Sequence, residues 1–413
     1  MKIAFYGNVA NNAYQIVHAL QSYTNIDAHL YLDTREKSAF LPENDNPSLK
    51  DTYPEWIHEI ALNPLTTLLT PWCSPLVAEL NQYDFVMVSG IGPVFAQFLK
   101  NKWCFMSTGG DLTLTPFPFK FLFYYRGLKS KLFHLILGQW QRMGLRHAPK
   151  IWSQPFFPFA NAIKNLSIPP ERVSWPYFLG IVDTERFVSN PDAAKNTDEN
   201  MGALQEHDFV VFHPSRIMLD THPRRIATGD WKGNDKLIEG FAQFAARCPG
   251  NPVLAMPDRV ESSGVEEAKE MIARLGIEKN IVWLKPPRSF GFTRDELISF
   301  YSVADVVADE FATGWYGAVV LEGMSFGKPV LCTVDHTIMD QLYPWHPILS
   351  PQTPEEIANE LEKLYRHPEI RQKIGQQGRE WVVKFHSAQN AGPIYVERLT
   401  ELFADLNLEV PED

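Results

Sequence analysis

Short apolar runs alternate with longer amphipathic segments along the whole chain. Each run has the length of a buried strand, and each longer segment repeats its apolar residues at helical spacing. Strands that alternate with helices predict a parallel sheet wrapped by helices, so the predicted fold class is α/β. The predicted strands are 2–6, 29–32, 84–89, 103–107, 151–153, 173–177, 209–212, 253–256, 281–284, 306–308 and 330–331.

Capping signals and prolines mark boundaries between these elements. Thr293 and Glu296 have the spacing of a capping box, which predicts a helix over 294–303. Thr353 and Glu356 repeat this spacing at the start of another helix. Frequent prolines between residues 40 and 76 predict irregular surface structure there: Pro42, Pro47, Pro54, Pro64, Pro71 and Pro75.

A polar segment divides the chain into two halves. The length of 413 residues indicates two or three domains. Residues 184–207 are rich in Asn, Asp and Glu, so we place the linker between domains there. Each half is long enough to form a Rossmann-like domain of its own.

The stretch 305–332 places polar residues between a strand and a helix. Asp309 and Glu310 come directly after the apolar run 306–308, where the strand ends. The tight turn Gly314-Trp315-Tyr316-Gly317 follows. The pattern is that of a strand, a loop and a helix N-terminus, with glycine where the helix begins.

The helix that follows this turn begins beside Gly317. Its unpaired backbone amides and its dipole favour a phosphate, and Gly317 has no side chain to keep a phosphate away. Glu322 lies about one and a half turns further along, where it could accept hydrogen bonds from sugar hydroxyls. An ordinary α/β unit, in which the glycines serve only turns and packing, fits the same pattern.

In the first half, a predicted strand ends at Thr108-Gly109-Gly110-Asp111. Ligands of open α/β sheets bind outside the carboxyl ends of the strands, so Asp111 is a candidate for contacting a substrate hydroxyl. Capping of the following turn is an equally good role for this carboxylate. The loop after the first strand lacks Gly-x-Gly-x-x-Gly, so no dinucleotide site is predicted.

Charge and composition exclude several classes of function. The formal net charge of −11 argues against a nucleic-acid partner. The four cysteines are widely separated, without the spacing of a zinc or redox site. No run of 18 apolar residues occurs, and the amino end is too short for a signal-peptide core, so we predict a cytoplasmic protein.

A basic segment interrupts the acidic balance. Residues 112–170 contain eight basic residues and no Asp or Glu, so the remainder of the chain carries −11 − 8 = −19. Basic residues interleaved with aromatic residues suit peripheral contact with the inner face of a membrane that carries anionic lipid, here through 116–147. A buried aromatic helix pair with solvated lysines is the alternative. The basic residues are Lys120, Arg126, Lys129, Lys131, Arg142, Arg146, Lys150 and Lys164.

Three blocks of the second half carry a resemblance to a known family. They are His213-Pro214-Ser215-Arg216, Lys232-Gly233-x-Asp235, and Gly-Trp-Tyr-Gly-x-x-x-Leu-Glu-Gly-Met-x-x-Gly-Lys-Pro-Val from Gly314 to Val330. This half resembles the nucleotide-sugar domain of glycosyltransferases with the GT-B fold, and it is similar to family 4, the retaining group. The first half resembles the acceptor domain more loosely, through its opening βαβ unit and its Thr-Gly-Gly-Asp turn.

The resemblance implies two Rossmann-like domains that face each other across a cleft. An N-terminal acceptor-side domain would span 1–185, with a final helix in 393–413 that crosses back to it. A C-terminal nucleotide-sugar domain would span 186–392. The implied reaction moves a sugar from a nucleotide-diphosphate donor to a hydroxyl acceptor, such as a glycan or a lipid-linked sugar, with no separate cofactor. No Asp-x-Asp occurs in the sequence, and we predict no metal.

The resemblance also implies roles for individual residues. Arg216 and Lys232 would grip the donor diphosphate, because fixed cations stabilise the leaving group as its negative charge grows. We count these two and Asp111 as the catalytic candidates. The implied donor-binding residues are Ser215, Glu310, Gly314, Tyr316, Gly317, Ala318 and Glu322, of which Gly317 and Ala318 offer amides to the phosphates and Glu322 binds the ribose.

One departure from the family pattern affects the donor sugar. The family has an earlier glutamate eight positions before Glu322, and this chain has Gly314 there. Asp309 or Glu310 is a candidate to replace it, and a different sugar contact is the alternative. A sugar-nucleotide epimerase or phosphorylase on the same fold, and a catalytically silent nucleotide-sugar binding protein, therefore remain open.

Overall fold

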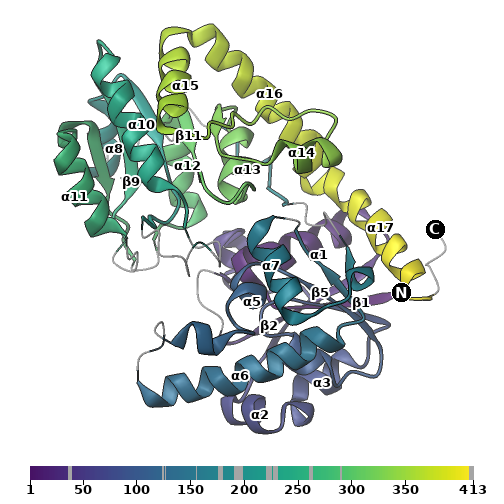
Figure 1. The fold of residues 1–413 in the computed structure, drawn as a ribbon. Helices are drawn as coiled ribbons and strands as arrows, with labels where there is room; N and C mark the ends of the chain where they lie inside the picture. The colour runs from purple at the N-terminus through teal and green to yellow at the C-terminus, as the bar shows by residue number, and fades with distance from the viewer. Residues whose placement is uncertain are drawn as a thin grey trace. The chain divides into compact units, whose positions relative to one another are not determined.

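The chain forms two compact units, Met1–Leu179 with Ala388–Asp413 (unit 1) and Gly180–Ser387 (unit 2). The structure is a computed structural model, and it describes residues 1–35, 40–122, 125, 127–154, 156–174, 180–189, 199–219, 226, 231–259, 264–288 and 291–408. Each unit is a parallel sheet covered by helices (Figure 1). The predicted α/β class is therefore confirmed.

The sheet of unit 1 has the strand order β3-β2-β1-β4-β5-β6-β7 within the described residues. The order reverses beside β1, which pairs with both β2 and β4. In open α/β sheets, ligand crevices lie outside the carboxyl ends of the strands at such a reversal. The strands are β1 Lys2–Tyr6, β2 Asp27–Asp33, β3 Ile57–Ile60, β4 Phe85–Val88, β5 Lys102–Met106, β6 Lys150–Trp152 and β7 Val173–Ser174.

Helices cover both faces of this sheet because successive strand residues point to opposite sides. Val86 and Val88 of β4 belong to a buried cluster with Leu145 of α6, whereas the Phe85 ring contacts Phe403 of α17 at a centroid distance of 5.0 Å. The helices are α1 Asn12–Tyr23, α2 Pro64–Leu69, α3 Pro75–Leu80, α4 Pro93–Ala96, α5 Gly110–Thr113, α6 Leu128–His147, α7 Phe157–Leu166 and α17 Ala388–Asp405.

The proline-rich segment is more regular than the sequence indicates. Residues 40–76 were expected to be irregular, but Ile57–Ile60 forms the edge strand β3 and pairs with β2. Most of the prolines begin short helices, as Pro64 begins α2. Proline favours the first helical position because its missing N–H has no partner to lose there.

The sheet of unit 2 has the order β10-β9-β8-β11-β12 within the described residues. Its strands are β8 Phe209–Phe212, β9 Pro252–Pro257, β10 Ile281–Leu284, β11 Val306–Ala308 and β12 Val330–Leu331. Its helices are α8 Glu199–Gln205, α10 Asn234–Arg247, α11 Val265–Leu275, α12 Arg294–Val303, α13 Ala318–Ser325, α14 His336–Leu342, α15 Pro354–Arg366 and α16 Pro368–His386.

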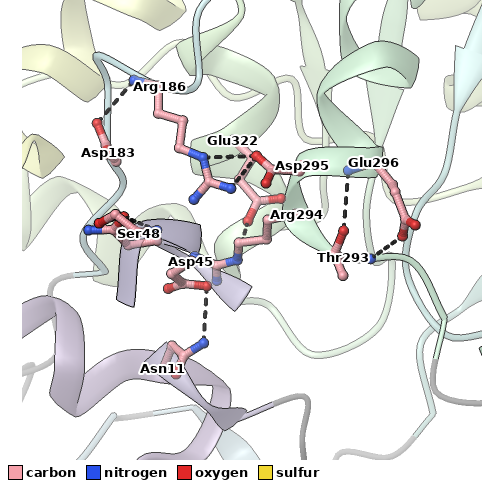
Figure 2. A network of polar contacts seen from close by, with 11 residues as sticks. Asn11, Asp45, Ser48, Asp183, Arg186, Thr293, Arg294, Asp295, Glu296 and Glu322 are labelled. Atoms are coloured by element: carbon pink, nitrogen blue, oxygen red, sulfur yellow. Dashed lines mark hydrogen bonds and ion pairs between the residues drawn. The ribbon is translucent and has the colours of Figure 1, made fainter. Parts of the chain in front are cut away.

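Both predicted capping boxes are present in unit 2. At the start of α12, Thr293 and Glu296 each bond the backbone N–H of the other (Figure 2). Thr353 and Glu356 do the same at the start of α15. The segment 184–207, predicted as an irregular linker, contains helix α8. Residues 190–198 of this segment lie outside the described residues.

In the part of the chain that the structure describes, no helix combines the length and the apolar character needed to cross a bilayer.

Helix α13 packs on α16, where the two backbones approach each other closely. A Cβ added to Gly375 of α16 would lie 1.9 Å from the Gly327 carbonyl oxygen, just after α13. Arg379, one turn further along α16, donates to the Ser325 carbonyl at the end of α13. Because only glycine allows this approach, Gly375 helps to fix the position of α13.

Replacing Gly375 with alanine should therefore lower the free energy of unfolding, by about 1–3 kcal/mol, as expected for an overpacked buried contact. Gly202→Ala in α8 is the matched control, since a Cβ there meets nothing within 4 Å. Alanine in a helix should raise stability at that position by about 0.5–1 kcal/mol. Chemical denaturation of both variants measures the difference, and equal effects would contradict the packing role.

Candidate active site

The candidate site is built on two neighbouring strands of unit 2. In the parallel pair of β8 and β11, Val211 lies opposite Val306 and Phe212 opposite Val307. The strands therefore end side by side, and the loop 213–216 meets the acidic pair after β11. Polar side chains from segments far apart in sequence converge at this edge of the sheet.

Asp309 connects the loop after β8 with the start of α13. The Ser215 hydroxyl donates to the buried Asp309 carboxylate at 2.5 Å. A Cβ added to Gly317 would lie 3.7 Å from the other Asp309 oxygen. Gly317 is the N-cap of α13 and Ala318 its first residue, and both are exposed. The structure thus places the start of α13 beside Asp309, whose other oxygen accepts from Ser215.

Lys232 forms an ion pair with the buried Glu310 at the same place. Glu310 also accepts a hydrogen bond from the Thr313 hydroxyl. The backbone orients Lys232, since its carbonyl accepts from the Phe311 N–H at 2.8 Å. Gly233 has φ 68°, and a Cβ there would lie 2.9 Å from the Phe311 carbonyl carbon, so glycine is required beside the lysine.

Burial and the charge of the partner shift the pKa values of this ion pair in opposite directions. Burial raises the pKa of Glu310 to about 7, although the Lys232 ammonium opposes that shift. Burial lowers the pKa of Lys232, but the carboxylates of Glu310 and Asp309 together outweigh burial and raise the pKa overall. The charge of Arg216 acts on both groups and favours the loss of a proton from each.

His213 fixes the backbone that carries Ser215 and Arg216. Its Nδ1 lies 2.9 Å from the Ala308 carbonyl and its Nε2 lies 2.8 Å from the Asn234 side-chain nitrogen. The ring therefore donates from Nδ1 and accepts at Nε2. Burial lowers its pKa, which keeps it neutral and suited to both bonds.

Two arginines extend this group of charges. Arg216 is exposed. Arg259, which follows β9, donates to the Pro214 carbonyl at 3.1 Å. Burial and the charge of Arg216 both lower the pKa of Arg259. Sequence reasoning missed Arg259, although its place after a predicted strand was a usable signal.

Glu322 lies inside unit 2, where Tyr301 and Arg294 hold its carboxylate. The Tyr301 hydroxyl donates to one carboxylate oxygen at 2.7 Å. Arg294 Nε lies 3.3 Å from the other oxygen (Figure 2). Only 3% of Glu322 is exposed. These bonds orient the carboxylate, and a ribose hydroxyl would have to share its remaining lone pairs.

In the turn from Gly314 to Gly317, Gly314 acts through its backbone and Tyr316 buries its side chain. Gly314 has φ 78°, in the left-handed region, and its carbonyl accepts from the Asp335 N–H at 2.8 Å. The Tyr316 ring is buried, and its hydroxyl lies 2.6 Å from that of Tyr343. The Tyr316 side chain therefore packs in an aromatic cluster with Tyr343 and Trp381.

Asp111 belongs to unit 1 and binds the backbone of two loops. Its carboxylate accepts from the N–H groups of Thr108, Gly109 and Gly90 at 2.9–3.2 Å, and from the Thr108 hydroxyl at 2.8 Å. Burial raises its pKa, while these bonds oppose the shift. The contacts are those of the capping role, here extended to the loop after β4.

Among the described residues, no group of three or more His, Cys, Asp or Glu side chains could hold a metal ion. The positive charge available to an anion at this site comes from Lys232, Arg216, Arg259 and the start of α13.

Residues 227–381 match the family model described as glycosyl transferases group 1. The putative glycosyltransferase EpsD of Bacillus subtilis is 25% identical over 246 residues, which cover 58% of this chain and 57% of EpsD. A D-inositol 3-phosphate glycosyltransferase of Corynebacterium urealyticum is 34% identical over 106 residues, 25% of this chain and 24% of that protein. The chain thus spans little more than half of EpsD, and less of the second relative.

Among solved structures, Anabaena HepE in complex with UDP and glucose has a TM-score of 0.64 at 18% identity. The match covers 97% of this chain and all of that chain. The predicted GT-B class with two Rossmann-like domains is confirmed. The predicted enzyme class, a glycosyltransferase, agrees with the family match and with the names of the relatives.

The raised pKa of Glu310 predicts a pH dependence of stability. From its ordinary value of 4.5 up to about 7, the unfolded chain has released this proton while the folded protein still holds it, so stability falls as pH rises through this window. Glu310→Gln removes this contribution. Its unfolding free energy relative to wild type should therefore rise by up to about 3 kcal/mol between pH 4.5 and pH 8.

Chemical denaturation at both pH values measures this change. Glu267→Gln, at an exposed position of α11, is the control and should leave the pH profile unchanged. A constant difference between wild type and Glu310→Gln at the two pH values would contradict the raised pKa.

Proposed function

We propose that the protein transfers a sugar from a nucleotide-diphosphate donor to a hydroxyl acceptor, with retention of configuration. The observation that carries this proposal is the convergence of Lys232 and the loop 213–216, which carries Arg216, with the exposed start of α13 at the ends of β8 and β11. The family match over 227–381 supports it, because it includes Lys232 and the helix start.

The site suits a diphosphate leaving group. When the glycosidic bond breaks, negative charge grows on the diphosphate, and cations fixed beforehand stabilise that state more than the ground state. Lys232 and Arg216 would supply the charge, and the amides of Gly317 and Ala318 would donate hydrogen bonds to the same oxygens. The complexes of HepE with UDP and UDP-glucose support UDP-glucose as the first donor to test.

The Lys232–Glu310 pair suggests how the donor would enter. Without ligand, the Lys232 ammonium that would bind the phosphates is paired with the Glu310 carboxylate. We propose that the diphosphate replaces Glu310 as the partner of Lys232. The released carboxylate would then accept hydrogen bonds from the donor sugar, in the role of the glutamate that Gly314 replaces.

The other donor contacts follow from the same arrangement. Glu322, oriented by Tyr301 and Arg294, is proposed to accept from the ribose hydroxyls. The Ser215 hydroxyl, now bonded to Asp309, is proposed to turn to a phosphate oxygen. Gly314 and Tyr316 are proposed to shape the turn before α13 through their backbone.

For Asp111 we propose a role on the acceptor side. Its bonds to Gly90, Thr108 and Gly109 hold the loops after β4 and β5 together. The acceptor hydroxyl would then meet loops of fixed shape, whether it comes from a glycan or from a lipid-linked sugar.

Arg216→Ala and Lys232→Ala should each abolish most turnover, since each lost charged contact is worth about 1.5–3 kcal/mol, or roughly ten- to 150-fold. Release of UDP from UDP-glucose in the presence of an acceptor panel measures turnover. Lys279→Ala, an exposed cation of the same unit, is the control and should retain the wild-type rate.

Near-wild-type turnover in either site variant would contradict the proposed phosphate grip. An isomerised donor without any acceptor would indicate an epimerase. Donor binding in calorimetry without turnover across the panel would indicate a nucleotide-sugar binding protein.

A further inference from the structure

Helix α6 of unit 1 exposes apolar side chains where a surface helix normally exposes polar ones. Leu128, Leu132 and Met143 are 83%, 56% and 44% exposed. They lie on one side of the helix, because spacings of three and four residues keep side chains on one face. We name this face the α6 stripe, and it consists of Leu128, Leu132, Leu135, Gln139, Met143 and Arg146.

The first half of α6 packs on the core through Phe133, but none of residues 128–136 is fully buried, and full burial begins at Leu137. Besides Phe133, four of these nine residues are apolar and are exposed or only partly buried, namely Leu128, Leu132, Leu135 and Ile136. A globular protein rarely leaves so much apolar surface on one segment unless another surface covers it.

Two lysines flank the α6 stripe. Each helical residue is rotated by about 100° from the one before, so Lys129 and Lys131 fall on opposite sides of the leucines. Within the part of the chain that is described, neither lysine has a carboxylate partner. By contrast, Lys150 pairs with Asp405 at 2.5 Å. Unpaired positive charge is therefore available beside the exposed leucines.

A turn that contacts α6 carries the same pairing of apolar and basic groups. The short helix Pro118–Lys120 packs on α6, where a Cβ added to Gly138 would lie 2.6 Å from the Pro118 ring. Phe119 of this turn is 65% exposed, and Lys120 is exposed next to it. An aromatic ring beside a lysine repeats the pairing of apolar and basic groups on α6.

The distribution of charge indicates what covers this surface. Residues 112–170 contain no acidic residue, while the remainder of the chain carries −19. A two-fold contact between copies through the stripe would bring Lys129 and Lys131 of both copies together, with no carboxylate of this segment to pair with them. An anionic lipid surface supplies both phosphates for the lysines and an apolar layer for the leucines.

We propose that the α6 stripe, with Phe119 and Lys120, docks unit 1 onto the surface of a membrane that carries anionic lipid. The leucine side chains enter the boundary between headgroups and acyl chains. The lysine stems follow them while the ammonium groups stay with the lipid phosphates. This inference is independent of the donor site in unit 2. Phe123, Tyr124 and Arg126, part of the same basic and aromatic segment, lie outside the described residues.

Co-sedimentation of the whole protein with vesicles tests the docking. The protein should sediment with vesicles of phosphatidylcholine and phosphatidylglycerol, and much less with phosphatidylcholine alone. Lys129→Gln with Lys131→Gln should lower the partition constant about 30-fold, since each lysine near an anionic surface contributes about 1 kcal/mol. Leu128→Ser with Leu132→Ser should lower it at least tenfold, because two buried leucine side chains are lost.

Lys100→Gln with Lys102→Gln is the matched control, with the same loss of charge at exposed positions of unit 1 outside the basic segment. It should sediment like wild type, and circular dichroism should report an intact fold in every variant. Equal sedimentation with both vesicle types, or no effect of the stripe variants, would overturn the proposal. If the protein binds no vesicles but forms a dimer in ultracentrifugation, and Leu128→Ser with Leu132→Ser dissociates this dimer, then a second copy of the chain and not lipid covers the stripe.

Discussion

The parallel pairing of β8 with β11 is the constraint on which the candidate site depends. It sets the ends of two strands side by side, so that Ser215 reaches Asp309 and Glu310 lies within reach of Lys232. A shift of one residue in this register would turn every side chain of β11 to the other face of the sheet. The backbone thus holds acids and cations together at an edge where, left unpaired, each would be costly to bury.

Much of unit 2 could be predicted because its signals are local. The run 306–308 became β11, the turn after it led into α13, and both capping boxes formed where Thr and Glu are three residues apart. These features depend on neighbouring residues alone. Ser215 and Glu310, which the family resemblance named, are among the residues that converge. The rule that ligands bind beyond strand ends pointed to Asp111, and applied to β9 it would also have pointed to Arg259.

The remainder depends on contacts between distant residues. Nothing near Lys232 in the sequence reveals that its charge is bound by Glu310, and nothing near Tyr316 reveals that its hydroxyl meets Tyr343. Asp111 had two equally good roles until its bonds to the loop at Gly90 were known. The edge strand β3 was missed because it is short and lies among prolines, and its identity comes from pairing with β2.

Helix α17 imposes an order on the assembly of the chain. It belongs to unit 1, where it packs on α1 and brings Phe403 to Phe85, yet all of unit 2 precedes it in the sequence. A ribosome must therefore synthesise an entire second sheet before the first one receives its final covering helix. Until then the side of the amino-terminal sheet that carries Phe85 lacks the aromatic cover that Phe403 gives it.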